Sequence, residues 1–418
     1  MADWPPDPYP RDRRSSAPLP TVGEGEPSPL TPLPRTGRAG WAVGSAEPRD
    51  QSARAGGEGP LSGILNVDKP LGWTSHDVVG LVRRLTRQRQ VGHAGTLDPL
   101  ASGVLLVMMG QATRLSDYLM HGRKCYLARL RLGATTPTDD AEGEVTEAPA
   151  APGLTRERVA AALSAFRGDI EQVPPAYAAI KQGGVPVYKL ARQGKEPVLA
   201  ARRVRIDALA LLALDGEMLD ILVWCSAGTY IRALARDIGQ RLGCGAYLAG
   251  LRRLSSGAFG VDTAVGVQEL RQLADEGRVS EILAPLDEAV AGWPAVITTT
   301  QQARDVLHGN VIADSLLARA SPASVSNAAS VVYPQTTPDR PRANDGAGAS
   351  VGAPRDDGAD ARLYGPDGVL LALARYDARR QGWQPTKVLV SPGAPVSAEA
   401  DVTDAMIGTA TASAGGQA

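Results

Sequence analysis

Between residues 61 and 290, the apolar positions alternate between the two-residue period of a strand and the wider period of a helix. Residues 63–67 form a short apolar run, which predicts a strand. Thr74, with Asp77 three residues later, is typical of a capped helix start. The buried stripe of that helix is expected at Val78, Val79, Val82 and Leu85. The apolar run 104–109 predicts a buried strand.

The remainder of this region adds strands and helices in mixed order. Residues 124–132 alternate as in a strand, and Tyr126 lies on its apolar face with Ala128, Leu130 and Leu132. A long polar loop is expected over 133–153. Further expected elements are a helix from Ala112, a helix capped by Thr155, a hairpin over 203–214 and 218–225 turned at Asp215-Gly216, a helix over 229–242 ending at Gly243, a strand over 246–256, and helical stretches near 267–275 and 279–283. This mixture predicts one α+β domain over 61–290.

The pattern changes after residue 293. Residues 301–312 predict a helix, a glycine turn and a strand, and 362–377 predict a hairpin turned at Pro366-Asp367-Gly368. We therefore expect a small β-rich domain over 293–395, interrupted by a disordered insertion at about 313–361. Residues 1–60 and 396–418 are rich in small residues, Pro and Gly, and are also expected to be disordered.

Composition excludes several classes of function. The three cysteines are dispersed without CxxC spacing, which argues against a metal site and a disulfide framework and fits a reduced, cytoplasmic setting. No apolar run is long enough for a membrane span, and the N-terminus lacks the apolar core of a signal peptide. The net charge of −1 gives no nucleic-acid signal, but residues 61–133 hold ten Lys and Arg against four Asp. Such a local surplus would suit phosphates, although a solvated helix face would show it too.

The most informative stretch is 91–103, VGHAGTLDPLASG. Its glycines allow tight turns, Pro99 restricts the backbone, and Asp98 is the one acid within it. A loop acid is often only a cap for the next element. Here the whole string resembles the catalytic loop of TruB-type tRNA pseudouridine synthases. Four other segments resemble the same family in the same order, namely GILNVDKPLGWTSHDVV (63–79), QVPPAYAAIK (172–181), GVPVYKLARQG (184–194) and CSAGTYIRALARDIGQRLGCGAYLAGLRRL (225–254).

The resemblance implies a fold and an activity. The fold is the pseudouridine-synthase fold, an α+β domain with a central mixed, mainly antiparallel sheet flanked by helices. A fainter resemblance adds a small β-rich, PUA-like RNA-binding domain. The implied activity is isomerisation of uridine to pseudouridine at position 55, in the T-arm loop of tRNA. This reaction needs no cofactor or metal, and no nucleotide or metal motif is found in the sequence.

The resemblance also assigns roles to individual residues. Asp98 is the catalytic carboxylate, and a paired cation, Arg232, is expected to keep it ionised. Tyr126 is expected to stack on the flipped uracil, and Tyr230 to pack near the acid. His93 and Lys69 are expected to support the site, the first in base flipping and the second in ordering the loop. The residues expected to bind substrate are Leu251, Gly95 and Thr96.

Sequence reasoning alone leaves other interpretations of these residues open. Arg232 could be a surface helix arginine, Tyr230 a core tyrosine, and His93 a loop histidine with a backbone partner. The chain could also be a tRNA-folding chaperone in which binding matters more than catalysis, or a guide-RNA-dependent relative. The text LDPLASGVLLV resembles the stand-alone bacterial branch. We therefore expect a monomer that acts on the T-arm stem-loop without a guide RNA.

Overall fold

The computed structural model describes residues 60–148, 153–177, 181–182, 185–186, 199–313 and 356–390. Contacts within the chain divide these residues into two units, one ending at Pro285 and one starting at Leu286, and each is described by itself. The expected N-terminal extension, most of the expected insertion and the expected tail lie outside the described residues. The domain borders therefore stay a prediction.

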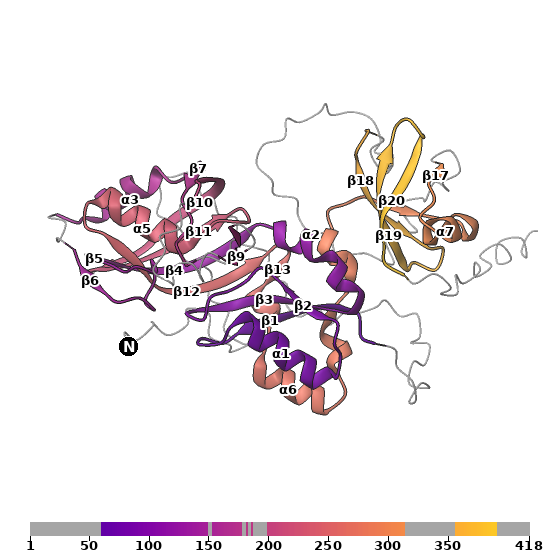
Figure 1. Cartoon of the computed structure of the whole chain (residues 1–418), viewed down its shortest axis with the longest axis horizontal. Helices are drawn as coiled ribbons and strands as arrows, with labels where there is room; N and C mark the ends of the chain where they lie inside the picture. Colours follow the sequence, from indigo (N-terminus) through magenta and orange to yellow (C-terminus); the bar gives the residue numbers. More distant parts are fainter. Residues whose placement is uncertain are drawn as a thin grey trace, which may run out of the picture. The chain divides into compact units, whose positions relative to one another are not determined.

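The first unit is built on one large sheet (Figure 1). Its main path runs β14 (Val265–Gly266), β1 (Gly63–Lys69), β3 (Ala101–Met109), β12 (Ala246–Ser256), β4 (Lys124–Leu132), β11 (Met218–Cys225), β10 (Arg202–Asp215) and β7 (Gly168–Gln172). Three short strands pair at its sides: β2 (Val91–Ala94) with β3, β15 (Leu283–Ala284) with β1, and β13 (Phe259–Gly260) with β12. The pairs β14–β1 and β3–β12 are parallel and the other pairs in this sheet are antiparallel. The expected mixed, mainly antiparallel sheet is confirmed.

Helices cover one face of this sheet. They are α1 (Ser75–Thr86), α3 (Arg156–Ser164), α5 (Ile231–Leu242) and α6 (Val267–Asp275); α1 lies beside α6, and α3 beside α5 (Figure 1). Their apolar residues join those of the central strands in one core that includes Val78, Leu163, Leu234 and Leu270. The expected capping box at Thr74 and Asp77 is present in α1, and Gly243 ends α5 with a φ of 79°.

Several elements differ from the expectation. The polar segment 133–153 contains a short hairpin, β5 (Ala134–Thr135) and β6 (Thr146–Glu147). The helix expected from Ala112 begins as a 3-10 turn, η2 (Gly110–Leu115), and continues as α2 (Ser116–His121); the stretch near 279–283 is a 3-10 helix, η4 (Val279–Ile282). Helix α5 begins at Ile231 rather than 229, because extended Tyr230 is its N-cap. Two-residue strands and single 3-10 turns are too short to leave a period in a sequence.

Within its described residues, the second unit is a smaller sheet with one α-helix. Its strand order is β16 (Ala295–Ile297), β18 (Asp360–Tyr364), β19 (Leu370–Asp377), β20 (Gly382–Val388) and β17 (Ile312–Ala313), with α7 (Thr300–Leu307) and a 3-10 turn η5 (Leu286–Val290). It has its own core around Trp383, Leu363 and Val306. The predicted helix and hairpin are both present, and the PUA-like identity of this unit stays a prediction.

Besides the β5–β6 hairpin, one further two-stranded pair stands apart from both larger sheets: β8 (Lys181–Gln182) pairs with β9 (Val185–Pro186). Among the described residues, no helix combines the length and the apolar character that a bilayer crossing requires.

Candidate active site

Asp98 lies in the connection between β2 and β3, and the backbone on both sides of it is tied down. The hydroxyl of Ser75, the first residue of α1, donates to the carbonyl of Leu97 (3.0 Å) and accepts from its N–H (2.9 Å). On the other side, the N–H of Gly72 donates to the carbonyl of Pro99 (2.8 Å). The start of α1 and the turn before it therefore hold the Asp98 loop in one conformation.

Arg232, the second residue of α5, meets Asp98 directly. Its Nε lies 3.1 Å from Oδ2 of Asp98, and its Nη1 lies 3.3 Å from Oδ2 of Asp140. Its side chain is 8% exposed, so the alternative of a surface helix arginine is wrong. Nη1 also donates to the carbonyl of Thr138 (3.3 Å), and Nη2 to that of Tyr177 (3.2 Å). The guanidinium is thus held from several sides and presents its Nε edge to Asp98.

The electrostatic environment of Asp98 is mixed. Its side chain keeps 40% of its surface open to solvent, yet the protein around the carboxyl removes enough water to raise its pKa above 3.8. Arg232 and Lys69 oppose this shift, whereas the charge of Asp140 adds to it. A carboxylate with a raised pKa is a stronger base than a free aspartate, provided that the nearby cations keep it ionised at neutral pH.

This balance predicts a shift in pH dependence. If ionised Asp98 is required, the rate falls as pH falls through its pKa. Arg232→Gln removes the largest influence that lowers this pKa, so the acid limb of the rate profile should move to higher pH. Single-turnover rates between about pH 4.5 and 8 would measure it.

Arg236→Gln is the matched control for this measurement. Arg236 lies one turn later on α5 and pairs with Asp139 and Asp237 instead of Asp98. The acid limb of the Arg236→Gln rate profile should stay at the wild-type pH. An Arg232→Gln profile that does not move, or moves to lower pH, would contradict the assignment of Arg232 as the cation for Asp98.

Asp140 is a site residue that the sequence analysis missed. Its side chain is 3% exposed, and its Oδ1 accepts hydrogen bonds from the Thr138 hydroxyl (2.7 Å) and the Glu142 N–H (3.0 Å). It therefore fixes the side of Arg232 that faces away from Asp98. The only signal in the sequence was two adjacent aspartates in a polar loop, which are usually exposed.

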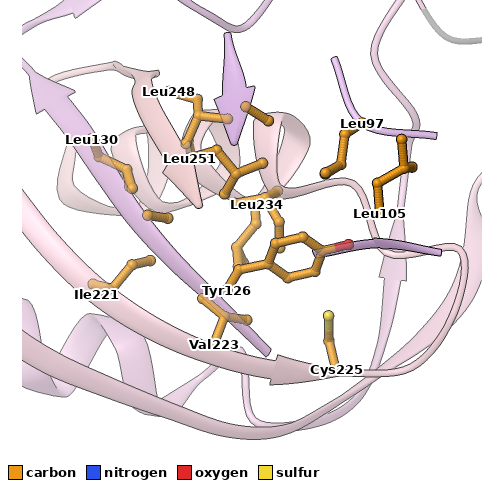
Figure 2. Packing of buried hydrophobic residues seen from close by; sticks show 14 of the residues in the cluster. Leu97, Leu105, Tyr126, Leu130, Ile221, Val223, Cys225, Leu234, Leu248 and Leu251 are labelled. Atoms are coloured by element: carbon orange, nitrogen blue, oxygen red, sulfur yellow. The ribbon is translucent and has the colours of Figure 1, made fainter. Parts of the chain in front are cut away.

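Tyr126 projects from β4 into the core between strand and helix residues, with its hydroxyl toward Leu97 and Leu105 (Figure 2). It is 6% exposed, and burial raises the pKa of its hydroxyl. Arg253 lies opposite Tyr126 in the pairing of β4 with β12; its charge lowers the pKa of the Tyr126 hydroxyl, whereas the charge of Asp98 raises it. The structure therefore brings Tyr126 to the loop that carries Asp98, while its stacking role stays a prediction.

Tyr230 precedes α5 and is held by a buried amide. The N–H of Tyr230 donates to Oε1 of Gln172 (2.8 Å), and Nε2 of Gln172 donates to the carbonyl of Tyr230 (3.1 Å). Burial raises the pKa of the Tyr230 hydroxyl; the charges of Arg202 and Arg232 lower it, and the charge of Asp98 raises it further. Tyr230 is partly buried rather than a core residue. Gln172, the last residue of β7, thus fixes the start of the helix that carries Arg232.

Lys69 and His93 lie nearby with different surroundings. Lys69 is fully buried and its Nζ donates to the carbonyls of Pro70 and Trp73; burial lowers its pKa to about 8. His93 packs edge-on against His76, with ring centroids 5.4 Å apart. Within the described chain its Nδ1 is buried without a hydrogen-bond partner, and burial lowers its pKa. The alternative in which a backbone group binds the His93 ring is therefore not seen at Nδ1.

The residues expected to bind substrate are spread around the same loop. Leu251 of β12 is buried in the core beside Tyr126 (Figure 2). Gly95 has a φ of 81°, which favours glycine, and its carbonyl accepts from Arg253 (3.0 Å). Thr96 is exposed next to it. Their contact with a substrate stays a prediction.

Other reactive groups in the described residues do not gather into a site. All three cysteines are free and buried, and burial raises the pKa of Cys125 and of Cys225 to about 12. No group of three or more His, Cys, Asp or Glu side chains there could hold a metal ion.

Comparison with known proteins now identifies the family. Residues 83–231 match the model of the TruB family pseudouridylate synthase N-terminal domain, and residues 232–291 match that of the tRNA pseudouridylate synthase B C-terminal domain. A tRNA pseudouridine synthase B from Mycobacterium sp. (strain KMS) is 50% identical over 275 residues, 64% of this chain and 91% of the relative. The chain belongs to the TruB family.

More distant members and solved structures agree with this placement. The tRNA pseudouridine synthase B of Geobacter sulfurreducens is 43% identical over 249 residues, covering 60% of this TruB-family chain and 82% of the relative. Among solved structures, a Cbf5-Nop10-Gar1 complex contains a chain with a TM-score of 0.56 and 23% identity, covering 79% of this chain and 85% of the other. A chain of an H/ACA RNP bound to a substrate RNA gives 0.55 and 22%, covering 79% and 86%. At these identities, the structural matches confirm the pseudouridine-synthase fold alone.

Proposed function

We propose that this chain isomerises uridine to pseudouridine in the T-arm loop of tRNA, at position 55. Family membership supports the reaction class, and curated relatives that the chain covers over 82–91% of their length are named for this activity on tRNA. The observation that carries the proposal is the Asp98–Arg232 pair at 3.1 Å, because it places an ionisable carboxylate in the loop that resembles the family's catalytic segment. A pure binding protein, such as a tRNA-folding chaperone, has no need for such a pair.

The reaction rearranges one nucleoside without adding or removing atoms. The bond from C1′ to N1 breaks, a bond from C1′ to C5 forms, C5 loses a proton and N1 gains one. Asp98 serves either as a nucleophile, or as a base whose negative charge also stabilises the cationic sugar. Arg232 keeps it ionised, and Asp140 keeps Arg232 in place. The cost of holding these charges in a partly dry site is met by their mutual pairing.

The other residues bind and orient the base. A stacked uridine has to leave the helix to reach Asp98, and in our proposal it then stacks on Tyr126 and contacts Leu251. Tyr230 packs beside the acid, His93 assists flipping, and Lys69 orders the turn through its two carbonyl contacts. Gly95 and Thr96 line the approach to the loop.

Binding is assigned to charge and to the second unit. The surplus of Lys and Arg over 61–133 includes the exposed arginines 84, 87 and 89 at the end of α1 and just after it, which suit RNA phosphates. We propose that the unit from 293 is PUA-like and adds RNA contacts, and that the protein acts in the cytoplasm as a monomer. The likeness to chains from H/ACA complexes is one of fold, and we propose that no guide RNA is involved.

The decisive test is direct. Purified protein is incubated with unmodified tRNA transcript, and pseudouridine is mapped by chemical probing. We expect one modified position, U55, and no modification of a transcript carrying cytidine there. Absence of pseudouridine with tRNA bound would favour the chaperone alternative.

Removal of residues 293–418, which belong to the second unit, should separate binding from chemistry. In a chain ending at residue 292, tRNA affinity should fall, whereas the single-turnover rate at saturating tRNA should stay within about threefold, because Asp98, Tyr126, Tyr230 and Arg232 all precede the cut. Deletion of residues 1–58 is the control and should change neither quantity more than about threefold. Normal binding with a much slower reaction would mean that the second unit shapes the active site.

A further inference from the structure

A second arginine, Arg253, lies under the catalytic loop. It belongs to β12 and is 1% exposed, which places it among the largest fully buried side chains of the described chain. A buried guanidinium is costly unless its donors are satisfied, so its partners indicate why it is there.

The partners of Arg253 lie in the Asp98 loop and on the strands next to β12. Its Nε donates to the carbonyl of Val104 (2.6 Å) on β3, and its Nη2 donates to the carbonyl of Gly95 (3.0 Å) in the loop that carries Asp98. In the pairing of β12 with β4, Arg253 lies directly opposite Tyr126, so the two side chains stand side by side on one face of the sheet. Both hydrogen-bond acceptors are neutral backbone carbonyls, so neither of them offsets the buried positive charge as a carboxylate would.

Backbone geometry fixes Arg253 at this place. Strands β3 and β12 pair in parallel with Gly103 opposite Arg253. A Cβ at residue 103 would lie 2.2 Å from the Arg253 carbonyl oxygen, and Gly103 has a φ of 99°. The two strands therefore approach more closely than any side chain at 103 allows, which brings the guanidinium to the start of β3 beneath the loop.

The chemistry of the two groups sets the direction of a bond between them. A guanidinium can only donate, so a hydrogen bond from Arg253 to the Tyr126 oxygen leaves the tyrosine O–H available to another acceptor. We propose that Arg253 is a positioning residue for pseudouridine formation, whose guanidinium holds the Tyr126 hydroxyl and the Asp98 loop in one fixed arrangement toward the uracil. This inference rests on the proposed function.

The electrostatics agree with this role and decide how it can be tested. Arg253 lowers the pKa of Tyr126 against the opposing effect of burial, while Cys225 and Asp98 raise it. Burial is the largest cause that lowers the pKa values of Lys69, Lys124 and His93, and the charge of Arg253 lowers them further; the two lysines have values of about 8. A pH profile would mix all these groups, so readouts at a single pH are required.

The contact can be observed without any activity. All ten tyrosines are replaced by 3-fluorotyrosine, and the ¹⁹F resonance of residue 126 is assigned by its loss in Tyr126→Phe. Arg253→Lys should shift this resonance more than that of any other tyrosine. The control is Arg252→Lys, since Arg252 is the neighbouring arginine, is 13% exposed, and pairs with Asp68 at 3.1 Å instead. It should leave the resonance in place.

Kinetics then test the role. Arg253→Lys should lower the single-turnover rate at saturating tRNA by about tenfold or more, and Arg253→Gln by more than that, with tRNA affinity within about threefold of wild type. Arg252→Lys should stay within about threefold in both.

The outcomes are distinct. An unmoved ¹⁹F resonance, a rate within threefold of wild type, or equal losses in Arg253→Lys and Arg252→Lys would each overturn the proposal. Failure of both Arg253 variants to fold would show a structural role only and would also overturn it. Wild-type protein that makes no pseudouridine in tRNA, while the resonance still responds to Arg253, would instead reject the proposed function.

Discussion

Asp98→Asn should reduce pseudouridine formation in tRNA by more than about 10³-fold while leaving tRNA affinity nearly unchanged. The amide keeps the shape of the side chain but cannot supply the negative charge that the reaction needs. It also keeps one oxygen near Arg232, whose Nε lies 3.1 Å from the carboxylate. Single-turnover assays with excess enzyme, together with filter binding, would measure both quantities.

Asp169→Asn is the matched control for this change. Asp169 is 42% exposed and pairs with Arg203, so it resembles Asp98 in exposure and in having an arginine partner, but it lies on the edge strand β7. Its rate should stay within about threefold of wild type. Turnover by Asp98→Asn within about tenfold of wild type, in a preparation free of host enzyme, would contradict the assignment of Asp98.

Tyr126→Phe should be slowed strongly, by about 10²-fold or more, with tRNA affinity within a few-fold. The ring that would stack on the base remains, and the hydroxyl that we propose Arg253 to hold is lost. Because Tyr126 is buried in the core, Tyr126→Ala would also leave a cavity and lower the free energy of unfolding by about 3–5 kcal/mol. Tyr126→Leu is therefore the better test of the ring, since it fills most of that volume.

The leucine variant should lose affinity as well as rate. Base stacking on an aromatic ring contributes about 1–3 kcal/mol, so tRNA binding should weaken by roughly 5- to 150-fold. A thermal melt close to that of Tyr126→Phe would show that the core is intact. Equal behaviour of the two variants in rate and affinity would reject the separation of stacking from hydroxyl chemistry.

Features that are set by neighbouring residues could be predicted from the sequence. The capping box of α1 requires only Thr74 and Asp77, and the hairpin of β10 and β11 requires two apolar strands and the turn at Asp215-Gly216. Both were predicted and are present. The meeting of Asp98 with Arg232 was expected through resemblance to a family, since nothing local to either residue indicates it.

Features that depend on the tertiary fold could not be predicted in this way. Asp140 and Arg253 are charged, and charged residues are usually exposed, so composition placed neither of them in the interior. Their burial follows from tertiary packing. Helix α5 packs against the loop that carries Asp140, and β12 packs against the loop that carries Gly95, each more than 90 residues away in sequence. Gln172 is similar, because its role depends on where Tyr230 lies and not on its own neighbours.

The position of β12 in the sheet has a consequence for how the protein is made. This strand lies between β3 and β4, although residues 246–256 leave the ribosome more than 110 residues after Leu132. Until it arrives, the strands that carry the Asp98 loop and Tyr126 have no direct pairing with each other, and the chain must close a large loop to complete the sheet. Activity should therefore appear late and all at once during synthesis, and nascent chains that stop before residue 256 should expose the unpaired edges of two apolar strands to aggregation and to chaperones.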